Sequence, residues 1–166
     1  QDEERQVRKI GGQGAIGGLK PLRALPCRVL ALVGLSDGAF PRRSDTPSWD
    51  LLAAAPQVGD RDPPLEDREL FLDSLLSAAD RLILTVPGRN VHTDKLEPMS
   101  VCVEELRRVC HAMGQLAGRG PKEIDGELLI DHPLQPFDPS NFSQSNFRSF
   151  HKVAFELGNQ WREGAG

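Results

Sequence analysis

Two short apolar runs, separated by an amphipathic stretch, constrain the fold of this 166-residue chain most strongly. Residues 28–33 read Arg-Val-Leu-Ala-Leu-Val and are followed by a glycine, and residues 81–86 are followed by Pro-Gly. Continuous apolar runs of this length predict strands buried on both faces of a parallel sheet, with residues 28–33 as a central strand. Residues 66–79, which lie between them, show helical spacing. The order strand, helix, strand therefore predicts an α/β layer.

Two helices are expected around the second strand. The first has acidic residues in its opening turn, where the helix dipole favours them, and an apolar stripe at i, i+3, i+4 and i+7. The stripe consists of Leu72, Leu75, Leu76 and Ala79. The second helix is expected to start after a Ser100 cap and to run to about residue 116. Its predicted face consists of Val103, Leu106, Cys110 and Met113.

The two ends of the chain differ in character from this centre. Residues 1–14 are charged and then glycine-rich, which predicts a flexible lead-in, and residues 15–19 form a candidate short strand. Residues 118–144 are expected to be a linker, polar over 118–126 and then proline-rich and extended over 132–142. A last helix is expected within residues 145–166, leading towards a further domain. Its stripe consists of Phe147, Phe150, Ala154, Leu157 and Trp161.

Composition excludes several classes of protein. The hydrophobic content is 39%, and no apolar run approaches the roughly 20 residues that a membrane span needs, so we expect one domain without a membrane partner. The sequence begins at Gln1 rather than methionine, which predicts a piece of a longer polypeptide. Its net charge of -4 argues against nucleic-acid binding through bulk electrostatics alone. Three cysteines without metal-ligand spacing, Cys27, Cys102 and Cys110, predict buried reduced thiols.

Other motifs that could indicate a catalytic or ligand-binding site are excluded by the sequence around them or by their spacing. Residues 12–17 match Gly-x-Gly-x-x-Gly, but they follow a polar segment and Pro21 prevents the helix that would receive a pyrophosphate. No phosphate-binding Gly-x-x-x-x-Gly-Lys-Ser/Thr loop occurs, and the four histidines lack zinc-ligand spacing. A carboxylate cluster over residues 60–69 is interrupted by arginines, which favours a solvated helix start over a two-metal site. The sequence therefore predicts no catalytic or metal site.

Two segments resemble motifs V and VI of the superfamily 1 DNA helicases. Residues 34–41, Gly-Leu-Ser-Asp-Gly-Ala-Phe-Pro, keep the second half of motif V, Gly-Leu-x-x-Gly-x-Phe-Pro, behind its strand. The first half, His-x-x-Lys-Gly-Leu-Glu-Phe, has diverged: Lys20, Arg23 and Pro26 stand at its histidine, lysine and glutamate positions. In motif VI the arginine that would reach the γ-phosphate is replaced by Ser77. Such an arginine is worth about 10³ to 10⁵ in rate, so we expect no ATP hydrolysis here.

Further segments resemble one particular family within this group. Residues 21–26, 37–42, 59–61 and 132–137 are similar to the gamma subunits of bacterial exodeoxyribonuclease V, the RecC family, whose helicase fold lacks helicase chemistry. The resemblance implies part of a RecA-like, P-loop NTPase-like helicase C-terminal domain over residues 15–117, with a parallel sheet flanked by helices. It also implies a cytoplasmic bacterial protein that acts in DNA repair and recombination.

The resemblance further implies a non-catalytic role. RecC-type subunits scaffold a heterotrimer with RecB-like and RecD-like motor subunits, split the duplex at DNA ends, channel single strands and contribute to Chi recognition. The parent complex uses ATP and Mg²⁺, whereas no cofactor is expected in this segment. Two other readings stay open: a fragment of an active AddB-like helicase–nuclease subunit, and a protein-interaction domain without DNA contact.

A set of arginines in the loops around the sheet provides candidate DNA contacts. Ligands of open α/β sheets bind at strand ends, and arginines there could hold phosphates along a strand. The candidates are Arg23, Arg42, Arg43, Arg61 and Arg68. In the alternative interpretation, these arginines pair with neighbouring carboxylates on a solvated surface. These carboxylates are Asp45, Asp60, Asp62 and Asp67.

Overall fold

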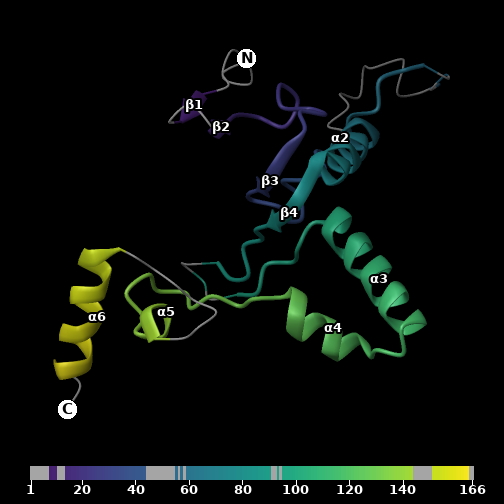
Figure 1. Ribbon diagram of the computed structural model, residues 1–166. Helices are drawn as coiled ribbons and strands as arrows, with labels where there is room; N and C mark the ends of the chain where they lie inside the picture. Colours follow the sequence, from purple (N-terminus) through teal and green to yellow (C-terminus); the bar gives the residue numbers. More distant parts are fainter. Residues whose placement is uncertain are drawn as a thin grey trace. The chain divides into compact units, whose positions relative to one another are not determined.

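The computed structural model describes residues 8–10, 14–43, 55, 57, 59–90, 93, 95–143 and 151–164 (Figure 1). The chain divides into two compact units. Unit 1 comprises Gln1–Pro87 and Glu97–Leu106, and unit 2 comprises Gly88–Leu96 and Arg107–Gly166. Each unit is described by itself below.

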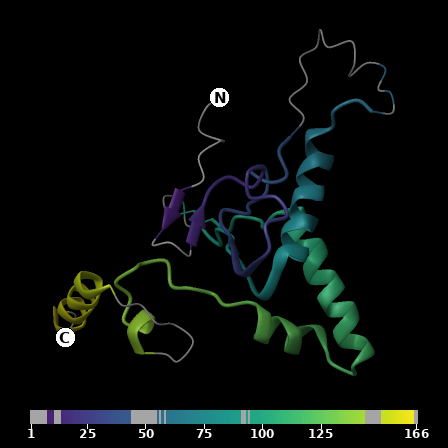
Figure 2. The same cartoon turned by 45° about the horizontal axis from the view of Figure 1, so that its top comes forward.

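Unit 1 is built on a strand–helix–strand arrangement, as expected. Strand β3 (Cys27–Leu32) pairs in parallel with β4 (Ala78–Leu84), and helix α2 (Pro63–Ser77) connects them in the chain. Figure 1 shows the two strands side by side, with α2 next to them, and Figure 2 shows the same helix, in blue-teal, in a second view. The mixed α/β class with a small parallel sheet is confirmed. The larger RecA-like domain stays a prediction.

The start of α2 follows from its sequence. Asp62 caps the helix by accepting a hydrogen bond from the backbone N–H of Leu65 at 3.4 Å. Two prolines occupy its first positions, where a missing N–H has no cost, and Glu66 lies in the first turn. The helix ends at Ser77, so Ala79 belongs to β4 and not to the helix as predicted.

The predicted apolar face of α2 is confirmed only at Leu75, which packs against the core. Leu72 and Leu76 are 54% and 77% exposed, whereas the buried residues are Asp67, Leu70, Phe71 and Ser74. Both sets have i, i+3, i+4 and i+7 spacing, so periodicity alone could not choose between them. Phe71 enters the core, and the burial of Asp67 depends on a partner far away in the sequence.

The strands are half buried rather than buried on both faces, which corrects a second prediction. Leu32 and Leu35 are buried with Phe71, and Leu30 and Leu84 pack against this cluster. Alternate residues such as Val29 and Ile83 are 54% and 47% exposed. Only two strands form this sheet among the described residues, and its outer face is largely exposed there.

A β-hairpin was only partly anticipated. Strand β1 (Arg8–Ile10) pairs antiparallel with β2 (Gly14–Ile16). The strand expected at residues 15–19 is thus shorter and starts earlier, and no strand was expected in residues 8–10.

Helix α3 (Val101–Leu116) matches its predicted bounds. Ser100 is fully buried, and its Oγ accepts a hydrogen bond from the N–H of Cys102 at 3.2 Å, which supports the predicted start. Cys102 and Val103 are buried in the core of unit 1. Met113, predicted on the apolar face, is 65% exposed.

Unit 2 contains a helix where a polar linker was expected. Helix α4 (Pro121–Leu128) begins with a proline and has Glu123 in its first turn. Its one buried residue, Ile124, lies so close to Gly114 of α3 that a Cβ there would meet the Ile124 Cδ1 at 2.0 Å. The glycine therefore makes room for the isoleucine, a contact that composition does not reveal.

The end of unit 2 has two further helices. They are α5 (Ser140–Ser143) and α6 (Lys152–Gly164). The predicted last helix is confirmed from residue 152, while residues 145–150 and the side chain of Trp161 lie outside the described part. Phe155 of α6 packs edge-to-face on Phe142 with ring centroids 5.4 Å apart.

Candidate functional site

The loop that resembles the second half of motif V has a defined backbone. Gly34 and Gly38 adopt φ values of 82° and 81°, a left-handed region that favours glycine. The Leu35 N–H donates to the Thr85 carbonyl at 3.1 Å, and the Ser100 N–H donates to the Leu35 carbonyl at 3.0 Å. The loop is therefore held against both β4 and the start of α3. This backbone conformation explains why glycine stands at both positions, as in the motif that the loop resembles.

The diverged first half of the motif lies beside α2. Ala24, at the glycine position of the motif, has a φ of 55°, a conformation that is costly for a residue with a Cβ. Arg23, at the lysine position, donates from Nε to Asp73 Oδ2 at 2.5 Å. Pro26, at the glutamate position, is exposed and carries no charge.

The motif VI position ends a helix instead of presenting a cation. Ser77 is the last residue of α2, and its Oγ donates to the Ser74 carbonyl at 2.9 Å. Its carbonyl accepts from the Cys27 thiol at 3.9 Å. The structure thus brings together the two segments that resemble motifs V and VI, and the residue at the position predicted for the motif VI arginine offers a hydroxyl.

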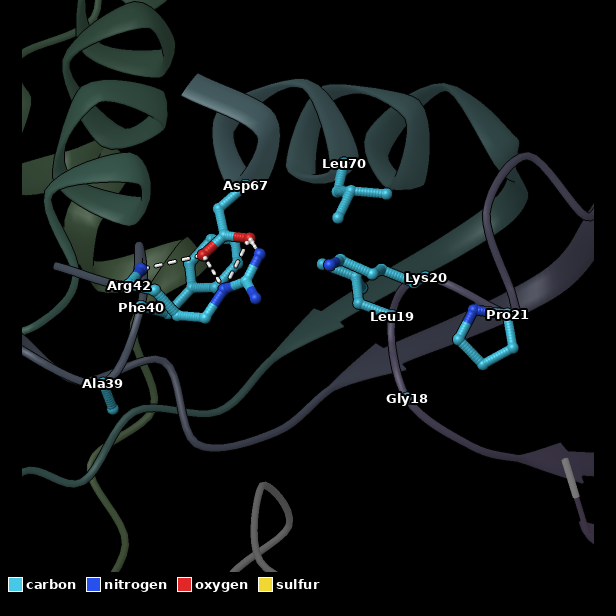
Figure 3. Close-up of a pocket in the computed structure, with 9 residues that line it drawn as sticks. All are labelled: Gly18, Leu19, Lys20, Pro21, Ala39, Phe40, Arg42, Asp67 and Leu70. Carbon is cyan, nitrogen blue, oxygen red and sulfur yellow. Dashed lines mark hydrogen bonds and ion pairs between the residues drawn. The ribbon is translucent and has the colours of Figure 1, made fainter. Parts of the chain in front are cut away.

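A pocket of about 180 Å³ lies between these loops and α2 (Figure 3). Its lining includes Lys20 before β3, Phe40 and Arg42 after β3, and Asp67 and Leu70 of α2. Figure 3 shows the Arg42 guanidinium turned to the Asp67 carboxylate and Lys20 on the other side of the pocket. Two cations and one carboxylate therefore line this space.

Arg42 pairs with Asp67, whose carboxylate is the only one buried among the described residues. The Arg42 Nη2 lies 2.7 Å from Asp67 Oδ1, and both Nε and the backbone N–H of Arg42 donate to the same carboxylate. The Asp67 side chain is 4% exposed and that of Arg42 38%. Burial raises the pKa of Asp67. The side-chain and backbone hydrogen bonds from Arg42 lower it and outweigh the effect of burial, so the pKa lies below its ordinary value.

Three cationic side chains lie close to the carboxylate of Glu66, the neighbour of Asp67. Arg61 Nε donates to its carboxylate at 2.8 Å, Arg42 Nη2 lies 3.9 Å away, and Lys20 Nζ lies 4.0 Å away. The hydrogen bond from Arg61 is the main cause that lowers the pKa of Glu66. Lys20, Arg42 and Arg61 are therefore brought together at the start of α2.

The remaining candidate arginines do not join this group. Arg23 pairs with Asp73, and Arg68 Nη1 lies 3.0 Å from Glu105 Oε2. The Arg43 guanidinium lies near Gly38, since a Cβ on that glycine would be 3.4 Å from Arg43 Nη2. Among the described residues, no carboxylate contacts Arg43.

Carboxylate pairing is confirmed for Arg23, Arg42, Arg61 and Arg68, but the partners were mostly mispredicted. Of the expected acids, Asp67 takes part in one of these pairs, with Arg42. Asp60 accepts from the Gln57 N–H at 2.8 Å and Asp62 caps α2, while Asp45 lies outside the described residues.

Sequence reasoning missed a second ion-pair cluster, in unit 2. Arg107 of α3 donates to both oxygens of Asp125 in α4, at 2.9 and 2.7 Å, and His111 Nε2 lies 2.7 Å from Asp125 Oδ1. The hydrogen bond from Arg107, followed by that from His111, lowers the pKa of Asp125 strongly. The i, i+4 spacing of Arg107 and His111 was the available signal, but the acid lies in the segment expected to be a linker.

The three cysteines are free of disulfides: Cys102 is buried, and Cys27 and Cys110 are partly buried. Within the described ranges, no cluster of three His, Cys, Asp or Glu side chains is arranged to hold a metal ion. No helix in that part of the chain is long and apolar enough to cross a membrane.

Comparison with known proteins gives consistent relatives. The chain is 40% identical over 121 residues to the RecBCD enzyme subunit RecC of Mycobacterium tuberculosis, covering 73% of this chain and 10% of that protein. It is 38% identical over 121 residues to the RecC subunit of Mycolicibacterium smegmatis, with the same coverage. It is 31% identical over 157 residues to the RecC subunit of Escherichia coli, covering 90% of this chain and 14% of that protein. No family profile matches. The chain thus spans about a tenth to a seventh of these relatives' length.

Proposed function

Since the chain belongs to the RecC family and spans only part of its relatives, we propose that it is a non-catalytic scaffold segment of a RecBCD-type helicase–nuclease. In this role the full-length polypeptide joins RecB-like and RecD-like motor subunits, accepts DNA ends during break repair and recombination, and guides the separated strands. ATP and Mg²⁺ act in the motor subunits. A contribution to Chi recognition forms part of the same proposal.

The observation that carries the non-catalytic assignment is Ser77. Its Oγ donates to the Ser74 carbonyl at the end of α2 and offers no positive charge to a γ-phosphate. An arginine in that role stabilises negative charge that develops during phosphoryl transfer. This substitution also weighs against an active AddB-like motor.

The arrangement of cations supports strand contact as part of the proposal. Lys20 is 39% exposed, and its Nζ is 4.0 Å from Glu66, a distance that leaves it able to turn to a phosphate. Arg43 follows Arg42 on the loop after β3 and has no carboxylate contact in the described part of the chain. Arg23, Arg42, Arg61 and Arg68 would contact DNA only by sharing or exchanging their acidic partners.

Reconstitution tests the scaffold proposal. The full-length chain is co-purified with its cognate motor subunits, and ATP-driven unwinding of a blunt duplex is measured with and without it. We expect a stable complex whose unwinding depends on the chain. A chain that stays apart from the motor subunits would contradict the assignment.

Salt-dependent DNA binding tests the strand contact. In the reconstituted complex, Arg43→Ala should weaken binding to a forked duplex at low salt and reduce the salt dependence by about one counterion, since one phosphate contact is removed. Arg28→Ala is the matched control, because Arg28 is an exposed arginine paired with Asp80 and outside the candidate set. Equal effects of the two variants, or none at any salt, would favour a protein-interaction role without DNA contact for this segment.

A further inference from the structure

The pocket beside α2 is lined by two cations and by a carboxylate that one of them already occupies. Lys20, Arg42 and Asp67 are its charged lining residues, and its volume of about 180 Å³ compares with about 30 Å³ for a water molecule in the liquid (Figure 3). The backbone N–H of Arg42 donates to Asp67 Oδ2 at 2.8 Å, and Arg42 Nη2 donates to Oδ1 at 2.7 Å. Asp67 therefore balances the charge of Arg42, and Lys20 supplies the second positive charge of the lining.

Glu66 lies next to this pocket, and one of its oxygens faces both cations. Its Oε2 is 4.0 Å from Lys20 Nζ and 3.9 Å from Arg42 Nη2. Both distances exceed those of hydrogen bonds, so the two cations attract the carboxylate without binding it closely. Glu66 thus offers the pocket cations a negative charge that belongs to the chain itself.

Arg61 holds the same carboxylate more tightly. Its Nε donates to Glu66 Oε1 at 2.8 Å and its Nη2 donates to Oε2 at 3.2 Å. Such a two-pronged contact fixes the orientation of a carboxylate. The Arg61 side chain is 66% exposed, so solvent screens the pair and allows it to exchange. Arg61 therefore competes with the pocket cations for Glu66.

The charges around the pocket explain why this competition matters to a DNA strand. Lys20 and Arg42 carry two positive charges, and Asp67 and Glu66 carry two negative ones. Without Glu66, one positive charge is left unbalanced. A phosphodiester carries one negative charge and accepts the same charge-assisted hydrogen bonds as a carboxylate. Glu66 and a phosphate are therefore alternative anions for the same two cations.

We infer that Glu66 is an internal competitor that limits the affinity of this pocket for a backbone phosphate of single-stranded DNA, and that Arg61 is the positioning residue that holds Glu66 back. Arg61 acts through Glu66 and not through its own contact with DNA. The inference rests on the strand contact proposed above and adds its chemical class, one phosphate, and the residue that sets its strength. Because phosphates carry no sequence information, the contact is independent of the bases.

Removal of the Glu66 charge tests the competition. In the reconstituted complex, Glu66→Gln should lower the Kd for a forked duplex about three- to tenfold at low salt, and the gain should shrink as salt screens the charges. Glu69→Gln is the matched control, because Glu69 is an exposed carboxylate on the same helix and outside the pocket lining. It should change the Kd by less than about twofold. No gain with Glu66→Gln, or an equal gain with both variants, would overturn the inference.

A double-mutant cycle tests the role of Arg61. Arg61→Ala alone should raise the Kd about threefold, because the released Glu66 carboxylate can then pair with Lys20 and Arg42. The same change made together with Glu66→Gln should have no further effect, since no charge remains to be held back. A similar loss in both backgrounds would mean that Arg61 contacts the strand itself, which would overturn its positioning role.

A neutral linkage identifies the ligand. One uncharged methylphosphonate is moved along the single-stranded arm of the fork, and at one position the gain from Glu66→Gln should disappear. A gain that persists at every position would exclude a strand phosphate as the ligand. If Arg43→Ala weakens binding as described above while Glu66→Gln has no effect, the strand contact stands and this inference fails. If neither variant changes binding at any salt, the strand contact itself fails.

Discussion

Two carboxylates, Asp67 in unit 1 and Asp125 in unit 2, are each bound by an arginine through two side-chain nitrogens, yet they differ in their surroundings. The Asp67 side chain is 4% exposed and lies one turn from Phe71 in the main core. The Asp125 side chain is 22% exposed and holds α4 to α3 beside a single buried residue, Ile124. The same chemistry therefore completes a core in unit 1 and fastens a helical hairpin in unit 2. We expect the energetic consequences to follow burial rather than the number of hydrogen bonds.

The core of unit 1 should be the most sensitive part of this comparison. Phe71 is 5% exposed, and its ring centroid is 6.0 Å from that of Phe40. Phe71→Ala should reduce the free energy of opening of α2 by about 4 kcal/mol, because a buried aromatic ring leaves a cavity. Native-state hydrogen exchange of α2 and β3 amides in the full-length chain measures this loss.

The exposed Glu69 on the same helix is the matched control. Glu69→Ala should change the opening free energy by less than about 0.5 kcal/mol, as is usual for surface positions. Similar losses for the two variants would contradict the helix face assigned to α2.

Removal of the charge at Asp67 should have the next largest effect. Asp67→Asn leaves the half-exposed Arg42 without its carboxylate and should cost about 3 kcal/mol in the same exchange measurement. Asp73→Asn breaks the more exposed pair with Arg23 and should cost less than about 1 kcal/mol. If the two asparagine variants lose the same amount, burial is not what distinguishes these pairs.

A smaller effect than at Asp67 is expected at Asp125, with a characteristic pH dependence. Its pKa is lowered in the folded chain, so the paired carboxylate stabilises the hairpin above the unfolded pKa of about 3.9, and this contribution is lost as the pH falls towards the folded pKa. Asp125→Asn should therefore lower the protection of α4 amides at pH 7, by less than Asp67→Asn lowers that of α2. The difference from the unmodified chain should shrink below about pH 4. A difference that grows on acidification would contradict the assigned direction.

The same contrast explains which parts of the fold could be predicted from sequence. The strand–helix–strand order was recoverable because apolar runs and helix caps are local signals, and both Ser100 and the start of α2 illustrate this. The buried face of α2 was not, because Asp67 is buried only through Arg42, 25 residues away. Helix α4 was missed because its stability depends on Ile124 fitting beside Gly114, a contact that the polar composition of this segment does not reveal.

The candidate site was predictable only in part for the same reason. The diverged motif positions stay a prediction, and the structure brings Cys27 and Ser77, one from each of the two segments, into contact. The partners of the arginines were sought among nearby acids, but Arg23 pairs across 50 residues and Arg68 across 37. Such pairs are set by tertiary packing and leave no local pattern.

ATP turnover by the isolated full-length chain tests the non-catalytic assignment most directly. The purified chain, without motor subunits, is assayed for ATP hydrolysis with Mg²⁺ in the presence and absence of a forked duplex. We expect no turnover above background in either case, because Ser77 cannot stabilise charge on the γ-phosphate. DNA-stimulated hydrolysis by the chain alone would contradict it.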